Sequence, residues 1–307
     1  MAVLVFGSVN MDLVTRTPRL PGAGETLMGT EFITTPGGKG ANQAVALAKL
    51  GVPTQMIGRV GNDAFGQELL AGLRSVGVDT SGIEVDAAHH SGVAIITVAA
   101  TGENQIIGVL GANGAVGQTE LERLQHRLPG AKALLLQLEV SLEAVQAAAQ
   151  AGRAAGVPVI LDPAPVPPES IAHLYGTIDF LVPNEVEAGQ LVGFPVTDRS
   201  SAMEAARLLQ SRGVRTVIVK LGAQGAVCVT PEETFFTPAF AVEAVDTVAA
   251  GDAFAGGLVA GLVEGLPLRQ AVVWGAAAGA LAVTRIGAQV AMGDRATFDT
   301  FLRNHPG

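Results

Sequence analysis

Residues 246–254 are Asp246-Thr247-Val248-Ala249-Ala250-Gly251-Asp252-Ala253-Phe254, and they lead from a short extended segment into a helix rich in small side chains. Because Ala249, Ala250 and Gly251 have almost no side chain, backbone N–H groups at the start of this helix can approach a ligand closely. Those groups and the positive end of the helix dipole favour an anion, most often a phosphate. Asp252 could then take a proton from a bound hydroxyl. Acidic residues also cap helix starts, so the stretch alone leaves both interpretations open.

The composition of the chain favours a large α/β protein. Its 307 residues are 49% hydrophobic and 4% aromatic and include 39 glycines. A chain rich in Ala, Val and Leu suits parallel strands covered by helices. No long linker, repeat or change of composition divides the sequence. We therefore predict a single α/β domain over residues 1–307, with a mainly parallel sheet between two layers of helices.

The charge and the apolar segments indicate a cytoplasmic protein that binds small molecules. The formal net charge of -9 argues against nucleic acid, whose binding needs a basic surface. No uninterrupted apolar run is long enough to span a membrane, and Met1 is followed directly by the apolar residues 3–6 without a basic leader. The one cysteine, Cys228, lies in an apolar run, where an inert buried thiol is expected and a reducing compartment fits.

A second glycine-rich helix start is Gly37-Gly38-Lys39-Gly40-Ala41-Asn42-Gln43-Ala44, ahead of a helical run over residues 45–50. The glycines permit close approach of the backbone to a ligand, and Lys39 and Asn42 add a cation and an amide beside it. The stretch is not a Walker motif, because no Ser or Thr follows the lysine. Glycines at a helix start also serve plain packing, but the two polar side chains favour a binding site.

Three extended segments are expected to form a small separate sheet. Residues 92–99 and 105–110 flank a turn and predict a β-hairpin. Residues 26–33, ahead of Pro36, are expected to join this hairpin. We interpret the small sheet as a lid, with its strands inserted at about residues 13–34 and 91–110.

The rest of the chain alternates between strands and helices, which implies right-handed crossovers in a parallel sheet. Strands are expected at residues 56–60, 133–138, 157–161, 178–182 and 216–220, and helices at residues 64–76, 142–155, 185–192, 202–212, 253–264 and 268–283. Residues 235–240 and 242–245 are expected to be extended. Thr119 and Glu122 are expected to form a capping box for a helix that ends near Leu128.

Polar side chains follow several of the predicted strands. They are Asn10 and Asp12 in the turn after the first strand, and Glu139, Asp162, Asn184 and Glu187 after later ones. Since each lies at the carboxyl end of a strand, we expect all of them to face one crevice. Turn chemistry alone would also explain Asn10 and Asp12. Asn and Glu without His or Cys would suit Mg²⁺ held largely through water and ligand phosphates, rather than zinc.

With these residues in place, the sequence resembles the ribokinase, or PfkB-type, carbohydrate kinase family over nearly its whole length. The two family signatures match residues 37–44 and 246–254. The other matching segments are Gly7-Ser8-Val9-Asn10-Met11-Asp12, Leu136-Gln137-Leu138-Glu139, Pro183-Asn184-Glu185-Val186-Glu187 and Thr284-Arg285-Ile286-Gly287-Ala288-Gln289. The resemblance implies a ribokinase-like fold and direct phosphoryl transfer from ATP to a primary sugar hydroxyl, with the 5-hydroxyl of D-ribose expected first.

The resemblance also implies a role for each matching residue. Asp252 would be the catalytic base, beside an anion hole made by the N–H groups of Ala249, Ala250, Gly251 and Asp252. The sugar would be held by Asn10, Asp12, Gly38, Lys39, Asn42, Glu139 and Asp252. The nucleotide phosphates would lie near Asn184, Glu187, Lys220, Gly222, Thr247 and Gly251, with Glu187 holding Mg²⁺ through water. A K⁺ ion would be bound by Asp246, Val248, Ala282, Arg285 and Gly287, mostly through backbone carbonyls. The lid of similar kinases also builds a dimer interface, so a homodimer is expected.

Three positions depart from the family pattern. Lys220 stands where Thr is frequent, which changes the expected contact to the phosphates. Ala276 falls where some relatives place Asn or His near the adenine, and Val290-Ala291 replaces a Pro-Ser pair next to the K⁺ site. Base selectivity and one K⁺ ligand therefore stay open.

Other functions also stay open. Another kinase of the same family would act on 2-keto-3-deoxygluconate, fructose or deoxyribose, whereas a nucleoside is disfavoured because the predicted sugar shell lacks an aromatic side chain for stacking. A dinucleotide-dependent oxidoreductase is disfavoured because no Gly-x-Gly-x-x-Gly follows the first strand. A non-catalytic sugar-binding protein would normally have lost the base, and Asp252 is present.

Overall fold

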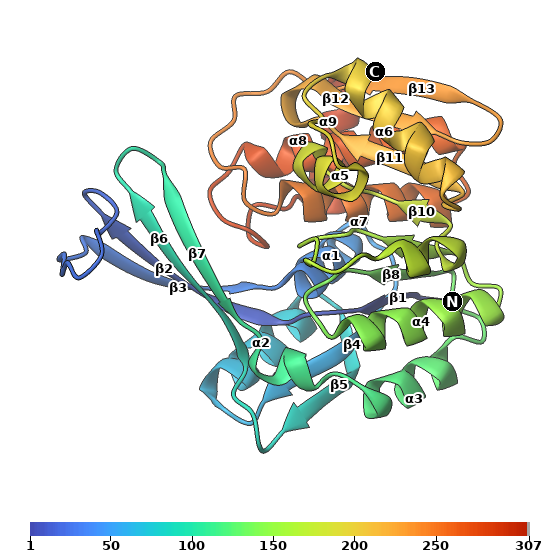
Figure 1. Ribbon diagram of the computed structural model, residues 1–307. Helices are drawn as coiled ribbons and strands as arrows, with labels where there is room; N and C mark the ends of the chain where they lie inside the picture. Colours follow the sequence, from blue (N-terminus) through green and yellow to red (C-terminus); the bar gives the residue numbers. More distant parts are fainter. Residues whose placement is uncertain (306–307) are drawn as a thin grey trace.

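The computed structural model describes residues 1–305 and contains a nine-stranded sheet and a four-stranded sheet (Figure 1). The order of strands in the large sheet is β13-β12-β11-β10-β9-β8-β1-β4-β5. Its strands are β1 Val3–Phe6, β4 Thr54–Gly61, β5 Asp79–Asp86, β8 Ala133–Leu136, β9 Val159–Leu161, β10 Phe180–Leu181, β11 Thr216–Lys220, β12 Gly225–Val229 and β13 Thr234–Pro238. The neighbouring strands β5, β4, β1, β8, β9, β10 and β11 are parallel to one another. Strands β12 and β13 are antiparallel additions at one edge.

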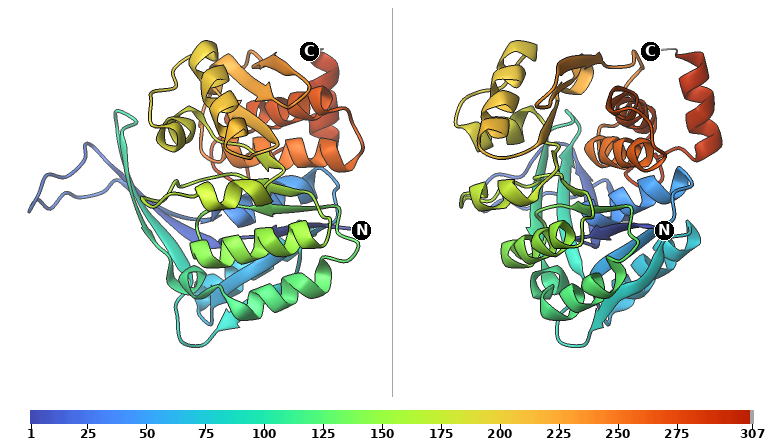
Figure 2. Two further views of the ribbon diagram at one scale, coloured as in Figure 1. Left: turned by 45° about the vertical axis from the view of Figure 1, so that its right-hand side comes forward. Right: turned by 90° about the vertical axis from the view of Figure 1, so that its right-hand side faces the viewer.

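Helices cover both faces of the large sheet, as the two views of Figure 2 show. One face is covered by α1 Lys39–Lys49, α2 Ala64–Ser75, α7 Ala250–Val263, α8 Leu268–Val283 and α9 Arg295–Asn304. The other is covered by α3 Gln118–Arg127, α4 Leu142–Ala154, α5 Glu185–Val192 and α6 Arg199–Ser211. In β1, Val3 and Val5 pack into the first core while Leu4 and Phe6 pack into the second. A strand buried on both faces must be apolar throughout, which explains its uninterrupted hydrophobic run.

The smaller sheet extends away from the body of the molecule (Figure 1). Its order is β3-β2-β6-β7, with bounds β3 Glu31–Gly37, β2 Asn10–Thr17, β6 Gly92–Ala99 and β7 Asn104–Val109. The parallel pair β2 and β6 lies in the middle, and β3 and β7 pair antiparallel at the edges. Every residue of β7 is exposed. We call these four strands the small sheet.

The fold class predicted from the sequence is confirmed, with local corrections. Asn10 and Asp12 lie in β2 and not in a turn. The strand expected at residues 26–33 is β3, which starts at Glu31 and includes Pro36; an edge strand tolerates a proline. Residues 242–245 form no strand, whereas β5 and α9 were not predicted. Within residues 1–305, no helix is long and apolar enough to cross a membrane.

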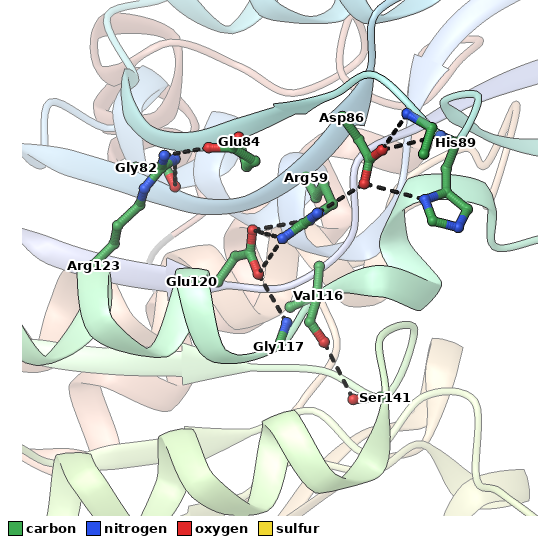
Figure 3. Close-up of polar contacts among 11 residues, drawn as sticks. Arg59, Gly82, Glu84, Asp86, His89, Val116, Gly117, Glu120, Arg123 and Ser141 are labelled. Carbon is green, nitrogen blue, oxygen red and sulfur yellow. Dashed lines mark hydrogen bonds and ion pairs between the residues drawn. The ribbon is translucent and has the colours of Figure 1, made fainter.

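A buried ion network joins β4, β5 and α3 (Figure 3). Arg59 Nη1 donates to Asp86 Oδ2 at 2.8 Å, and Arg59 Nε donates to Glu120 Oε1 at 3.0 Å. Glu120 also accepts the N–H of Gly117 at 2.8 Å, and Asp86 accepts two backbone N–H groups of the loop that leads to β6. We call Arg59, Asp86 and Glu120 the Arg59 cluster. The capping box expected from Thr119 and Glu122 is wrong, because α3 begins after Gly117 and Glu120 is its capping acid.

Candidate active site

A cavity of about 450 Å³ lies at the carboxyl ends of the central strands, between the starts of α1, α5 and α7. Its polar lining comes from Lys39, Asp162, Asn184, Glu185, Glu187, Lys220, Thr247 and Asp252. Its apolar lining comes from α8 and from the segment between β13 and α7, and includes Phe240, Val242, Ala276, Ala280 and Val283. Such a mixture suits a ligand with an anionic part and a flat apolar part. Residues 242–245, which form no strand, contribute Val242 and Ala244 to this lining.

The start of α7 is shaped to receive an anion. Its N-cap, Ala249, has φ 57° and is the one residue other than glycine with positive φ among residues 1–305. A left-handed alanine costs roughly 1 kcal/mol, and such strain persists where a turn has a purpose. The N–H of Ala250 makes a long bond of 3.3 Å to the Thr247 carbonyl, while those of Gly251 and Asp252 have no protein acceptor in the described part of the chain. Two N–H groups therefore remain available to a ligand.

Asp252 is held in place by two side-chain amides from α1. Asn42 Nδ2 donates to Asp252 Oδ2 at 2.9 Å, and Gln43 Nε2 donates to Asp252 Oδ1 at 3.0 Å. Burial raises the pKa of Asp252; the charge of Lys39 opposes this shift and that of Asp162 adds to it. A buried, positioned carboxylate that binds a proton more readily than usual has the properties of a general base.

Lys220 reaches the same place from the end of β11. Its Nζ donates to Asp162 Oδ1 at 2.9 Å, and a Cβ atom placed on Gly251 would stand 3.3 Å from that nitrogen. The ammonium group therefore lies beside the first turn of α7. Both members of the Lys220–Asp162 pair are largely buried. A lysine here adds a mobile positive charge to the N–H groups of the helix start.

The residues predicted to hold a sugar come together around the start of α1. Glu139 Oε2 accepts the N–H of Lys39 at 2.9 Å and the hydroxyl of Ser8 at 2.6 Å. Burial first, and then the charges of Glu139 and Asp252, raise the pKa of Asp12 to about 7. Burial lowers the pKa of Lys39, but the surrounding carboxylates, Asp252 above all, more than reverse that shift.

Backbone contacts explain the glycines of this region. Gly38 has φ 86°, and a Cβ atom there would stand 2.7 Å from the Asn10 nitrogen. A Cβ atom on Gly37 would stand 2.3 Å from Asp12 Oδ2. These clashes would push β2 away from α1 and separate Asn10 and Asp12 from Lys39.

Asn184 and Glu187 lie at the start of α5 and bond to each other. Glu187 N–H donates to Asn184 Oδ1 at 2.8 Å, and Asn184 N–H donates to Glu187 Oε2 at 2.7 Å. Burial and the charge of Asp162 raise the pKa of Glu187 against the opposing charge of Lys220. The two residues therefore cap the helix and also line the cavity. A nearby cation would favour the charged form of Glu187.

The segments predicted to bind K⁺ are joined by Asp246. Its Oδ1 accepts the N–H of Val248 at 3.0 Å, and its Oδ2 accepts the N–H of Gly287 at 2.9 Å. Ala282 and Arg285 lie at the end of α8 and are joined by a 3.3 Å bond from the Arg285 N–H to the Ala282 carbonyl. Asp246 thus fixes the turn before α7 against the turn after α8. Within residues 1–305, no group of three His, Cys, Asp or Glu side chains is arranged as a metal site.

Several polar side chains of the site were not predicted, among them Ser8, Gln43, Asn113 and Gln137. Asn113 Nδ2 donates to Asn10 Oδ1 at 2.7 Å, and Gln137 Nε2 donates to Gln43 Oε1 at 2.5 Å. Gln43 lies within the glycine-rich stretch, and Ser8 and Gln137 lie within other matching segments. Their place in these segments could therefore have indicated Ser8, Gln43 and Gln137 as site residues. No feature of the sequence indicated Asn113.

Known proteins are similar to this chain over most of its length. A sequence model of the family described as pfkB family carbohydrate kinase matches residues 2–295. A ribokinase of Haemophilus influenzae is 38% identical over 300 residues, covering 98% of both chains. A deoxyribokinase of Salmonella typhi is 41% identical over 256 residues, covering 83% of this chain and 84% of the relative. The structure of an Arabidopsis thaliana ribokinase complexed with ribose and ATP superposes with a TM-score of 0.88, at 34% identity and 99% coverage of both chains.

Proposed function

The chain belongs to the pfkB family of carbohydrate kinases, and we propose that it uses ATP to phosphorylate the 5-hydroxyl of D-ribose, giving ribose 5-phosphate. The observation that carries this proposal is the Asp252 carboxylate, clamped by two amides in the first turn of α7 beside unpaired N–H groups. A base and an anion site next to each other are what in-line transfer of a phosphoryl group to an alcohol needs.

Asp252 is proposed to accept the proton of the sugar hydroxyl. An ordinary carboxylate is a weak base toward an alcohol, but in a loose transition state the proton moves late. Burial raises the pKa of Asp252 and increases its basicity. The proton therefore passes to Asp252 as the oxygen bonds to phosphorus. The anion hole of residues 249–252, above all the unpaired N–H groups of Gly251 and Asp252, stabilises the charge on the transferring group.

The sugar is proposed to lie among Asn10, Asp12, Gly38, Lys39, Asn42 and Glu139. Support comes from their common position around the start of α1, with Glu139 bonded to the Lys39 N–H and Asn42 bonded to Asp252. Several charged and amide groups in a small volume can bind a polyhydroxylated ligand and fix which hydroxyl meets the base.

The nucleotide is proposed to occupy the cavity, with its phosphates toward Lys220, Gly222, Thr247 and Gly251 and its base in the apolar part near Ala276. Asn184 and Glu187 would hold Mg²⁺, mostly through water, and support comes from their common place at the start of α5 in the lining of the cavity. When bound, Mg²⁺ neutralises charge on the phosphates. Lys220 would contact a phosphate as a point charge.

A K⁺ site is proposed at Asp246, Val248, Ala282, Arg285 and Gly287. The bonds from Val248 and Gly287 to Asp246 support it, because they bring two carbonyl-rich turns together behind the anion site. K⁺ there would stiffen the turn that carries the strained Ala249. Replacing K⁺ by tetramethylammonium in an assay with ATP and Mg²⁺ is expected to lower kcat; an unchanged kcat would remove the site from the proposal.

The small sheet is proposed to be part of the single domain, to act as a lid over the site and to form the interface of a homodimer. A lid would exclude water, which competes with the sugar as phosphoryl acceptor. Support comes from the exposed apolar side chains that its strands carry: Phe32, Ile33, Ile95, Ile106, Ile107 and Val109. Exposed apolar side chains gathered on one small sheet are commonly covered by a partner.

The test is a coupled ADP-release assay with ribose, 2-deoxyribose, fructose, 2-keto-3-deoxygluconate and adenosine. Ribose is expected to give the highest kcat/KM. Deoxyribose is the second candidate, because the deoxyribokinase of Salmonella typhi is 41% identical to this chain. A higher kcat/KM for deoxyribose would replace ribose by that sugar, and activity with none of the sugars would overturn the kinase function.

A further inference from the structure

The Gln43 side chain joins two buried carboxylates that lie on different parts of the chain. Gln43 Nε2 donates to Asp252 Oδ1 at 3.0 Å and to Asp162 Oδ2 at 2.9 Å. The two aspartates are 209 and 119 residues away in sequence. Gln43 and Asp162 are buried almost completely, and Asp252 is 4% exposed, so water cannot replace these bonds. Gln43 has no contact of this kind elsewhere except with Gln137 in the described part of the chain.

The chemistry of the groups fixes how the Gln43 amide is oriented. Ionised carboxylates can only accept hydrogen bonds, so both amide hydrogens of Gln43 must point toward Asp162 and Asp252. The Gln43 oxygen then needs a donor, and Gln137 Nε2 supplies it at 2.5 Å. A buried amide with all its groups engaged in one arrangement is rigid. The position of the Asp252 carboxylate is therefore set by α1 as well as by α7.

The bridge continues to the edge of the phosphate site. The other oxygen of Asp162, Oδ1, accepts a bond from Lys220 Nζ at 2.9 Å. Lys220 lies beside Gly251 at the start of α7. Three consecutive contacts, Lys220 to Asp162, Asp162 to Gln43 and Gln43 to Asp252, thus connect the expected position of a phosphate with the base.

We propose that Gln43 is a positioning residue for phosphoryl transfer, which holds the Asp252 carboxylate in its reactive orientation and couples its charge to the Lys220–Asp162 ion pair. The inference rests on the proposed kinase function and adds a part to it. An incoming phosphate would draw part of the positive charge of Lys220 away from Asp162. The negative charge of Asp162 would then act more strongly on Asp252, which lies on the other side of Gln43. Asp252 then binds a proton more readily, so the arrival of the nucleotide would strengthen the base.

Several charged groups face Asp252 from the elements packed around it. Lys39 on α1 favours its ionised form, and Asp162 after β9 opposes it. Asp12 on β2 also interacts with Asp252, and Glu139 and Glu187 lie close enough to act on the shared neighbour Lys39. Like Asn42, Gln43 is a neutral donor among these groups. Removing its N–H groups should therefore shift the titration of the base with no change in net charge.

The main test is Gln43→Met, which keeps the length of the side chain and removes both donors. We expect kcat for ribose to fall about ten- to a hundred-fold, since a small displacement of a reacting group has an effect of this size, with KM within about threefold. The acid limb of the kcat against pH profile should move to higher pH by about half a unit to one unit, because a donor to the charged form is lost. A profile that coincides with that of wild type, in a variant with a native circular dichroism spectrum, would overturn the proposal.

The matched control is Gln137→Met. It also removes a buried amide, but one that touches Gln43 and neither carboxylate. Its thermal stability should fall, and its acid limb should move less than that of Gln43→Met, because both donors of Gln43 to the carboxylates remain. An equal shift in both variants would mean that any loss of polarity in this core perturbs the base, and would also overturn the proposal.

A second variant decides the question if Gln43→Met does not fold. Asp162→Asn keeps an oxygen for Gln43 and removes the negative charge at the far end of the bridge. Its acid limb should move to lower pH, opposite to that of Gln43→Met. An unmoved limb would refute the coupling. Activity of wild type on ribose separates this failure from failure of the proposed function, since a wild type that is inactive on every sugar would contradict the kinase assignment itself.

Discussion

Two buried groups in this protein both combine carboxylates with cations, but the pKa values of their carboxylates shift in opposite directions. In the Arg59 cluster, hydrogen bonds from Arg59 come first in holding the pKa of Asp86 well below its usual range, followed by backbone N–H groups. In the active site, burial comes first and raises the pKa of Asp12, Glu187 and Asp252.

The difference lies in how completely the carboxylates are hydrogen-bonded. Glu120 receives Arg59 on both oxygens and the Gly117 N–H in addition, and Asp86 receives Arg59 and two backbone N–H groups. In the site, the carboxylates of Asp12, Glu139, Asp162, Glu187 and Asp252 share the two cations Lys39 and Lys220. In the structural cluster, the protein itself supplies enough donors and positive charge for every carboxylate. In the binding site the carboxylates lack such partners, and bound ligands can supply them.

The largest expected effect is a loss of kcat, and it comes from a substitution in the active site and not in the Arg59 cluster. Asp252→Asn removes the proposed base and keeps the size of the side chain, so kcat should fall about 10⁴-fold, roughly 5.5 kcal/mol in the barrier. The variant should remain folded, because the lost charge was unfavourable in its buried position. Steady-state kinetics with ribose and thermal unfolding measure both quantities.

Asp79→Asn is the control for Asp252→Asn, since it changes the same chemical group at the exposed start of the edge strand β5. Its kcat should match that of wild type. Turnover of Asp252→Asn within tenfold of wild type would remove Asp252 as the base and with it the functional half of the comparison.

The next largest effect breaks the Arg59 cluster. Arg59→Met leaves Glu120, which is fully buried, without its cation, and a broken buried ion pair of this kind costs about 4 kcal/mol of unfolding free energy. Urea denaturation measures the loss, and kcat per folded molecule should not change. Arg16→Met is the matched control: its pair with Glu31 is about half exposed, and its loss should cost at most about 1 kcal/mol. Equal losses in the two variants would show that burial of the Arg59 cluster does not matter.

These two groups also mark how far the sequence could predict the structure. The starts of α1 and α7 could be predicted because their signals are local: glycines and small residues next to each other, followed by a helix. Glu139, Asp162 and Asn184 could be placed at one crevice because parallel strands share an edge. The same local reasoning placed Asn10 and Asp12 in a turn, because their partners in β3 and β6 come much later in the chain.

Contacts between distant residues explain the rest of the failures. The partners of Arg59 lie 27 and 61 residues away, and nothing near Arg59 in the sequence indicates a pairing. Glu122 had the spacing of a capping acid to Thr119, but Glu120 takes that place because Arg59 and the Gly117 N–H hold its carboxylate. The bridge through Gln43 was likewise hidden, since it depends on how α1, β9 and α7 pack together.

A smaller effect concerns the sign of pH dependence in the site. Asp12 has a pKa of about 7 in the folded chain, above its ordinary value, so the unfolded chain loses this proton first as pH rises. Stability contributed by protonated Asp12 is therefore full below about pH 4, falls between about pH 4 and 7, and is absent above. Asp12→Asn should then be more stable than wild type by about 2 kcal/mol at pH 8 and equal to it near pH 4.

Urea denaturation of Asp12→Asn without ligands, at the two pH values, tests this expectation. Asp86→Asn is the comparison from the Arg59 cluster, and its sign is reversed: the pKa of Asp86 is lowered in the folded chain, so its contribution is present at pH 8 and is lost in acid. Stability differences of the same sign for both variants at pH 8 would contradict the contrast between the two groups.

The smallest expected effect tests where the Arg59 cluster ends. His89 Nδ1 lies 3.2 Å from Asp86 Oδ2, but the His89 side chain is 52% exposed (Figure 3). Asp86 keeps Arg59 and its backbone donors without this ring, so His89→Gln should cost about 0.3 kcal/mol or less, as exposed ion pairs do. Thermal unfolding measures it, with and without added salt to screen the exposed pair. A loss near that of Arg59→Met would place His89 inside the cluster and would mean that satisfaction of Asp86 depends on this exposed ring.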